Sequence, residues 1–217
     1  MELSASCQAG APAERRCGRG VPRPDLDRSK KNAAKNRKLI IFADESGLSE
    51  KPSIRSTWGK KGTTPVVVHS FSWAKRSMMG GLVYRWNGAP EKLTFEIIDG
   101  AYNLEGILRW CRRLVKLLAG APAYLIWDRL QAHRSKAVVA FLAHHRVEVI
   151  LLPGYSPNLN PTEWLWANLK GKELANFCAK DITEAAGEAR RGIRRIRNRS
   201  SLMKGFLAGA GLSFGSK

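Results

Sequence analysis

The sequence predicts an α/β domain in which a mixed sheet is flanked by helices. Two continuous apolar runs, at 39–43 and 124–127, are typical of strands buried on both faces. Between them, apolar residues recur at helical spacing over 104–118, with basic residues on the opposite face. The segment 124–152 is expected to form a strand, a helix and a second strand, and such a unit places its two strands parallel.

The other elements follow in chain order. Strands are expected at 65–71 and 78–86, and at 92–98, where apolar and polar residues alternate. A helix near 134–146 precedes a strand at 147–152, a loop at 153–161 and a helix that starts around Asn160. The last helix carries one apolar stripe, made of Ile182, Ala185, Ala186, Ala189, Ile193 and Ile196. We therefore divide the chain into a flexible basic arm at 1–37, a folded domain at 38–180, and a basic C-terminal helix and tail at 181–217.

The charge balance predicts a polyanionic partner. The 217 residues include 37 Lys and Arg against 18 Asp and Glu, a formal net charge of +19. No apolar run is long enough for a membrane-spanning helix, and the N-terminus lacks the apolar core of a secretory signal. The four cysteines are widely spaced and show no zinc-ligand pattern. We expect a cytoplasmic protein with neither disulfides nor structural zinc.

Three acidic residues are the strongest indication of chemistry. Asp44 and Asp128 each follow an apolar strand, and Glu163 opens a helix after a Pro-rich loop. Carboxylates at the ends of neighbouring strands can converge, and three close anions repel one another unless a cation lies between them. Hard oxygen ligands favour Mg²⁺ or Mn²⁺. In a basic protein, a site of this kind fits phosphodiester chemistry with two metal ions.

Each carboxylate also has a purely structural explanation. An Asp after a strand commonly serves turn chemistry. Asn160, Pro161 and Glu163 match a helix start with an N-cap, a first-turn proline and a capping-box glutamate. The prediction of a catalytic site therefore depends on the three residues together.

Two long segments carry a family resemblance. WDRLQAHRS at 127–135 resembles the second-Asp motif of mariner-type DDE transposases, in the bacterial insertion-sequence branch, and LPGYSPNLNPTE at 152–163 is similar to the loop before the family's Glu. Between Asp128 and Glu163 lie 34 residues, the spacing typical of this superfamily. FADESG at 42–47 and WGKKGTTP at 58–65 resemble the first-Asp motif and the segment after it. The resemblance extends from about residue 39 to 175.

The resemblance implies a ribonuclease H-like fold, with a five-stranded mixed sheet flanked by helices. It makes Asp44, Asp128 and Glu163 the metal ligands and catalytic residues of a DNA endonuclease. The implied reaction is hydrolytic nicking at element ends, followed by attack of the freed 3′-hydroxyl on target DNA, usually at TA sites. It also implies a homodimer on paired DNA ends, at the bacterial nucleoid. The family's helix-turn-helix region has no counterpart before residue 38, so we expect a separate polypeptide or a frameshifted N-terminal half to supply it.

Several neighbouring residues have two possible roles. Glu45 and Asp44 point to opposite faces of a strand, and periodicity alone does not say which faces the metal; the family pattern favours Asp44. His133 is either a partner of a site carboxylate or phosphate, or a structural histidine. Lys170, on the helix face of Glu163, either reaches a phosphate or is solvated.

The tryptophans and arginines near the C-terminus are likewise open. Trp164 and Trp166 are more typical of a core than of a base-stacking surface. The C-terminal arginines either contact the DNA backbone or form a solvated helix face: Arg190, Arg191, Arg194 and Arg197.

Two rival functions remain open at this level. A truncated, non-catalytic DNA-binding remnant would share the charge without needing all three carboxylates. Another ribonuclease H-fold nuclease, such as a junction resolvase, would need the metal site but not the long Pro-rich motif.

Overall fold

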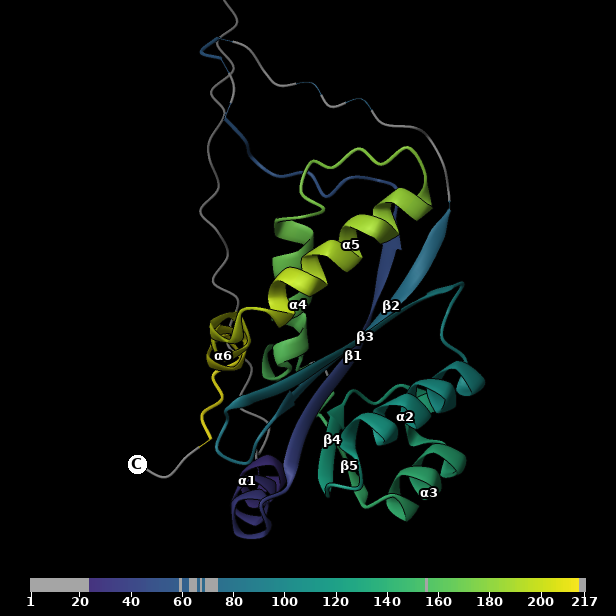
Figure 1. Ribbon diagram of the computed structural model, residues 1–217, viewed down its shortest axis with the longest axis vertical. Coiled ribbons are helices and arrows are strands. Elements are labelled where there is room, and N and C mark those ends of the chain that lie inside the picture. Colours follow the sequence, from purple (N-terminus) through teal and green to yellow (C-terminus); the bar gives the residue numbers. More distant parts are fainter. Residues whose placement is uncertain are drawn as a thin grey trace, which may run out of the picture.

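The computed structural model describes residues 24–58, 60–62, 66, 68, 74–154 and 156–214. In this part of the chain, five strands form one mixed sheet in the order β3-β2-β1-β4-β5 (Figure 1). The strands are β1 (Leu39–Ser49), β2 (Lys75–Tyr84), β3 (Pro90–Asp99), β4 (Ala123–Trp127) and β5 (Val147–Leu151). β1, β2 and β3 pair antiparallel, whereas β4 pairs parallel with both β1 and β5. The predicted parallel unit around β4 and β5 is confirmed, and the predicted strand at 65–71 lies mostly outside the described residues.

Helices cover both faces of the sheet. They are α1 (Pro24–Asn36), α2 (Leu104–Leu118), α3 (Lys136–His144), α4 (Pro161–Gly171), α5 (Ile182–Arg197) and α6 (Ser200–Gly209). Figure 1 shows α2 and α3 on one face, and α4, α5 and α6 on the other. Two short 3₁₀ turns, η1 (Gln131–Arg134) and η2 (Pro157–Leu159), lead into α3 and α4. None of the helices in the described ranges is long and apolar enough to cross a bilayer.

The continuous apolar run of β1 is explained by burial on both faces. Ile41 and Ala43 pack with α2 and α3, while Ile40 and Phe42 pack with α4, α5 and α6. Each face of the central strand therefore contributes to a separate apolar core. This arrangement fixes the position of β1, which carries the first candidate carboxylate.

The structure differs from the expected boundaries at both ends of the chain. Residues 24–36 form helix α1, so the expectation of a flexible arm is wrong for this part; residues 1–23 lie outside the described residues. α1 is attached by the buried Ala33 and by Asn32, whose Nδ2 donates to the Tyr124 hydroxyl at 2.6 Å. Of the side chains of α1 that the structure describes, Ala33 is the buried apolar one, which leaves little periodicity to detect in the sequence.

At the C-terminus, α5 and α6 belong to the same core as the sheet. Ala186, Ala189 and Ile196 of α5, and Phe206 of α6, are buried in the core that contains Phe42 and Leu82. The predicted apolar stripe of α5 is confirmed. The boundary at residue 180 therefore divides a single packed unit.

The approach of β3 and α2 to β2 requires a glycine at position 81. A Cβ on Gly81 would lie 2.6 Å from Thr94 Cγ2 and 3.1 Å from a ring carbon of Trp110. We predict that Gly81→Val lowers the free energy of unfolding by about 2 kcal/mol, because overpacking forces its neighbours apart. Gly205→Ala is the control: this exposed position in α6 has open space around a new Cβ, and the change should stabilise by about 0.5 kcal/mol. Urea denaturation measures both, and equal stability of the two variants would contradict the prediction.

Candidate active site

The first two carboxylates lie at the same level on adjacent positions of the sheet. β1 pairs with β4 from Leu39↔Ala123 to Phe42↔Ile126, so two further residues along each strand reach Asp44 and Asp128. Neighbouring strands lie about 4.8 Å apart. Asp128 directly follows β4, as predicted. Asp44 does not end its strand, because β1 continues to Ser49 by pairing with β2 after β4 has stopped; the prediction that it closes the strand is wrong.

The third carboxylate is carried by α4, whose first turn is bonded to β1. Asn160 Nδ2 donates to the carbonyl of Ala43 at 3.3 Å, and Thr162 Oγ1 donates to the carbonyl of Phe42 at 3.0 Å. Both side chains are buried. These two bonds fix the start of α4, and with it Glu163, beside the segment of β1 that carries Asp44.

Glu163 does not act as the capping-box residue that the sequence also allowed. The N-cap bond is made by Asn160, whose Oδ1 accepts from Thr162 N at 3.1 Å. The Asn160 N–H, which a capping-box glutamate would accept, instead donates to the carbonyl of Pro157 at 2.9 Å. The Glu163 side chain is exposed in a cavity that also contains Asp44 and Asp128.

This carboxylate cavity has a volume of about 350 Å³. Its described lining consists of Asp44, Asp128, Arg129, Leu152, Pro153, Gly154, Ser156, Pro157, Asn160 and Glu163. It therefore joins the end of β4, the middle of β1, the Pro-rich loop and the start of α4. Sequence analysis did not single out Arg129, although its position directly after Asp128 was a signal; its Nε donates to the carbonyl of Leu152 at 2.9 Å.

Asp44 is held from the α4 side by an indole. Trp166 Nε1 donates to Asp44 Oδ2 at 2.9 Å, and Trp166 is otherwise buried, as predicted for a core residue. Burial and the nearby charge of Glu163, supported by Glu45 and Asp128, raise the pKa of Asp44 to about 7 against the lowering effect of the indole. The raised pKa of this carboxyl thus reflects its burial first and the negative charge of its neighbours second.

His133 joins two acidic residues on the opposite side of β1. Its Nδ1 lies 2.7 Å from Asp128 Oδ1 and its Nε2 lies 2.9 Å from Glu45 Oε1. The fully buried ring stacks on Trp127 with centroids 3.9 Å apart. Burial alone would lower the pKa of His133, but the two carboxylates outweigh it and raise the pKa to about 9. The hydrogen bond from His133 in turn lowers the pKa of Asp128.

The orientation of the adjacent acids follows from strand alternation. Asp44 lies in the carboxylate cavity, whereas Glu45 faces the α2 and α3 side and contacts His133. Of the two residues that periodicity could not separate, the structure thus brings Asp44 together with Asp128 and Glu163.

The donor set of the cavity fits a hard divalent cation. Three carboxylates and no His or Cys line it, which is the chemistry that Mg²⁺ and Mn²⁺ prefer. In the described residues, no three His, Cys, Asp or Glu side chains are close enough together to cage a metal ion as they stand. Mutual repulsion opposes such a cluster, and a cation between the carboxylates would relieve the charge that raises the pKa of Asp44.

Other predicted residues lie elsewhere. Lys170 Nζ donates to Ser46 Oγ at 2.7 Å and lines a different cavity, beside residues 47–53, so the structure does not bring it to the three carboxylates. Trp164 is 46% exposed and its ring lies against Gly209. Arg190, Arg194 and Arg197 line a separate cavity next to β3, and Arg191 forms an ion pair with Glu188.

Comparison with known proteins agrees with this geometry. The model of the DDE superfamily endonuclease family matches residues 39–184. The sequence matches none of the curated proteins.

Solved structures of the Mos1 transposase share the fold. A pre-cleavage Mos1 transpososome is similar with a TM-score of 0.55 at 16% identity, over 88% of this chain and 61% of that one. The Mos1 paired-end complex with the left transposon end has a TM-score of 0.54 at 15% identity, over 96% of this chain and 68% of that one. The Mos1 mariner paired-end complex with Mn has a TM-score of 0.53 at 16% identity, over 91% of this chain and 65% of that one. The expected ribonuclease H-like fold is confirmed, and the chain spans about three-fifths of the length of the first of these proteins.

The histidine bridge makes a prediction about stability. We expect His133→Phe, which keeps a ring on Trp127 but removes the donor shared by Glu45 and Asp128, to lower the free energy of unfolding by about 2 kcal/mol. Asp128 is half exposed and keeps the Leu130 N–H, so most of this cost falls on Glu45. His144→Gln, at an exposed position of α3, should change it by less than about 0.5 kcal/mol. Thermal and urea denaturation measure the free energy of unfolding of both variants. A His133→Phe protein as stable as the wild type would show that the bridge is not structural.

Proposed function

Because the chain belongs to the DDE superfamily endonucleases, we propose that it is the catalytic part of a transposase. In this proposal it cuts DNA at the ends of a mobile element and joins the freed 3′ ends to target DNA. The observation that carries the proposal is the carboxylate cavity, which is lined by an acid of β1, the acid that follows β4 and an acid of α4. Neither turn chemistry nor helix capping explains why Glu163 shares this cavity with Asp44 and Asp128.

The roles of the three carboxylates follow from their positions. Asp44, Asp128 and Glu163 would hold two Mg²⁺ or Mn²⁺ ions. Such ions, when bound, activate the attacking oxygen and stabilise the leaving oxygen of a phosphodiester. The Mos1 paired-end complex that contains Mn, with the same fold, supports a divalent ion here.

The surrounding residues would orient this site. The Trp166 N–H fixes one oxygen of Asp44, and His133 together with the Leu130 N–H fixes Oδ1 of Asp128. Among the described residues, the second oxygen of Asp44 and of Asp128 accepts no hydrogen bond and would be available to a ligand. Arg129 lines the same cavity and supplies positive charge close to where a phosphate would lie.

The finer parts of the proposal rest on the two long motifs and the charge. The motif at 152–163 supports membership of the bacterial insertion-sequence branch, with insertion at TA sites in the nucleoid of the cytoplasm. Paired-end complexes of Mos1 with transposon ends support a homodimer that binds DNA ends. We further propose that a helix-turn-helix polypeptide, separate or produced by frameshifting, provides recognition of the terminal inverted repeats.

The catalytic proposal is tested by nicking of supercoiled plasmid DNA in the presence of Mg²⁺. We expect Asp44→Asn, Asp128→Asn and Glu163→Gln each to lower the nicking rate roughly a thousand-fold or more. Each change removes one charged metal ligand, and the three ligands would act together, so the loss of any one disables the site. EDTA should have the same effect on the wild-type protein. Glu148→Gln, an exposed acid on β5 that pairs with Lys38, should nick at the wild-type rate.

The outcome separates the rival functions. Equal nicking by the wild type and Asp128→Asn would defeat the enzyme proposal and favour a non-catalytic DNA-binding remnant. Activity confined to four-way junctions, with no joining of 3′ ends to a target plasmid, would favour a junction resolvase instead.

A second prediction concerns salt. The net charge of +19 predicts that DNA affinity comes mainly from phosphate contacts. A protein that neutralises roughly six to ten phosphates loses about a thousand-fold or more in affinity between about 50 and 200 mM salt. Fluorescence anisotropy with a labelled duplex measures this slope, and a slope near zero would contradict the prediction.

A further inference from the structure

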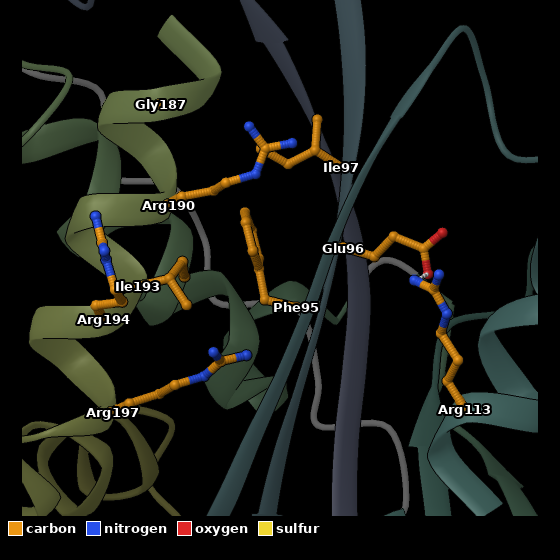
Figure 2. Close-up of a pocket in the computed structure, with 9 residues that line it drawn as sticks. All are labelled: Phe95, Glu96, Ile97, Arg113, Gly187, Arg190, Ile193, Arg194 and Arg197. Atoms are coloured by element: carbon orange, nitrogen blue, oxygen red, sulfur yellow. Dashed lines mark ion pairs between the residues drawn. The ribbon is translucent and has the colours of Figure 1, made fainter. Parts of the chain in front are cut away.

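A second cavity, of about 520 Å³, lies along β3, which forms one edge of the sheet in the described part of the chain. We call it the arginine cavity. Its lining consists of Phe95, Glu96, Ile97, Arg113, Gly187, Arg190, Ile193, Arg194 and Arg197 (Figure 2). It shares no lining residue with the carboxylate cavity. Four arginines in one cavity indicate a binding site for negative charge.

The charge of this cavity is not balanced by the protein around it. Its acidic lining residue, Glu96, is 8% exposed and points to the α2 side of β3, where Arg113 and Arg109 lie 2.8 Å and 3.3 Å from its oxygens. On the α5 side, neither Arg190 nor Arg194 forms an ion pair with any acid among the described residues. Positive charge therefore remains available to a ligand between α5 and β3.

The spacing of the arginines fits a polymeric anion. Arg190, Arg194 and Arg197 follow one face of α5 over about 10 Å of helix axis. Successive phosphates of one DNA strand rise about 3.4 Å each along the duplex axis and also wind around it, so they lie farther apart in space than this rise. A row of this length therefore matches about two of them. Figure 2 shows Arg190 and Arg197 extending from α5 toward β3. Arg197 is held there because its Nε donates to the carbonyl of Leu93 at 3.1 Å.

The cavity also offers an apolar surface between its arginines. Phe95, Ile97 and Ile193 line it, and Phe95 is only partly buried. Sugars and bases present apolar faces next to their phosphates, and aromatic rings accept them by stacking. A free phosphate ion would not use these side chains, whereas a nucleotide strand would use both them and the arginines.

We propose that the arginine cavity binds the backbone of one DNA strand outside the carboxylate cavity. This inference rests on the proposed function, in which DNA is the substrate. The two cavities lie at the same level of the sheet, because Phe95 pairs with Gly80 and Gly80 pairs with Asp44. Trp166 lies between them: its ring is 6.4 Å from that of Phe95, and its N–H donates to Asp44. A strand held along β3 would thus lie about two strand spacings, roughly 10 Å, from Asp44.

The test uses the full chain and a labelled DNA duplex, with EDTA present so that binding is measured without cleavage. The double variant Arg190→Gln/Arg194→Gln should bind roughly ten-fold more weakly than the wild type, and its log–log salt slope should be less steep by about 2, one phosphate contact for each lost arginine. The matched control is Arg112→Gln/Lys116→Gln, which removes the same charge from two exposed residues of α2. The control should lose less than about three-fold in affinity, since screened charge outside the site contributes little.

Each outcome decides the inference. Equal losses in the two double variants would overturn it, because the effect would then be one of net charge alone. Competition by polyglutamate as strong as that by unlabelled DNA at equal charge would also overturn it, in favour of an acidic peptide. Unchanged circular dichroism and melting temperature in both variants would tie the affinity loss to the cavity; an affinity loss that tracks unfolding would count against it.

The same measurements keep this inference apart from the proposed function. A protein that binds DNA through Arg190 and Arg194 but never nicks would support the arginine cavity and defeat the catalytic proposal. If the wild type nicks normally and the Arg190→Gln/Arg194→Gln variant binds DNA as tightly as the wild type, the catalytic proposal is supported and the arginine cavity is defeated.

Discussion

The candidate site depends on the point at which β1 loses one of its two neighbouring strands. Pairing with β4 ends at Phe42, while pairing with β2 continues to Ser49. From Phe42 onward, carbonyl groups of β1 on the β4 side need other donors, since unpaired backbone groups are costly to bury. Asn160 supplies one to the carbonyl of Ala43. Thr162 adds a second bond, to the carbonyl of Phe42, and the first turn of α4 is thereby attached to β1. A backbone requirement of the central strand thus brings Glu163 to Asp44.

The second constraint is electrostatic. Asp44, Asp128 and Glu163 repel one another, and the raised pKa of Asp44 reflects the resulting cost together with that of burial. The protein limits this cost by giving Asp44 and Asp128 neutral or cationic donors from opposite faces of the sheet, Trp166 on one and His133 on the other. Both donors are rigid aromatic groups packed in a core, so they orient the carboxylates without occupying the cavity. Stability of the fold and geometry of the site therefore depend on the same side chains.

The sequence predicted the parts of the fold that repeat a pattern. The apolar runs of β1 and β4, the stripe of α2 and the unit around β5 each involve several residues that are buried for the same reason, so periodicity detects them. The extension of β1 to Ser49 was missed because residues 45–49 are mostly polar and their strand conformation comes from pairing with β2. Helix α1 was missed because its described contacts are mostly polar, such as Asn32 with Tyr124 and Lys30 with the Phe214 ring, and such contacts leave no apolar periodicity. Within the candidate site, spacing and motif predicted the three carboxylates, and the structure places all three in the lining of one cavity. The contact of Lys170 with Ser46 depends on how far β1 extends, and spacing along α4 says nothing about that.

The sheet also separates opposite charges that would otherwise cancel. Among the acids of the candidate site, Asp44 lies on the central strand β1, Asp128 follows β4, and Glu163 begins α4. Arg190 and Arg194, which form no ion pair among the described residues, lie on α5 beside the outer strand β3. If the arginines were moved to the carboxylate cavity, they would neutralise the ligands of a divalent cation and compete with it. If they were far away, they would add affinity without aligning the DNA. The arginines lie two strands from Asp44, with Trp166 and Phe95 in the space between. In the function we propose, this separation would keep the cation site at the reacting phosphate and the arginines at phosphates that stay intact.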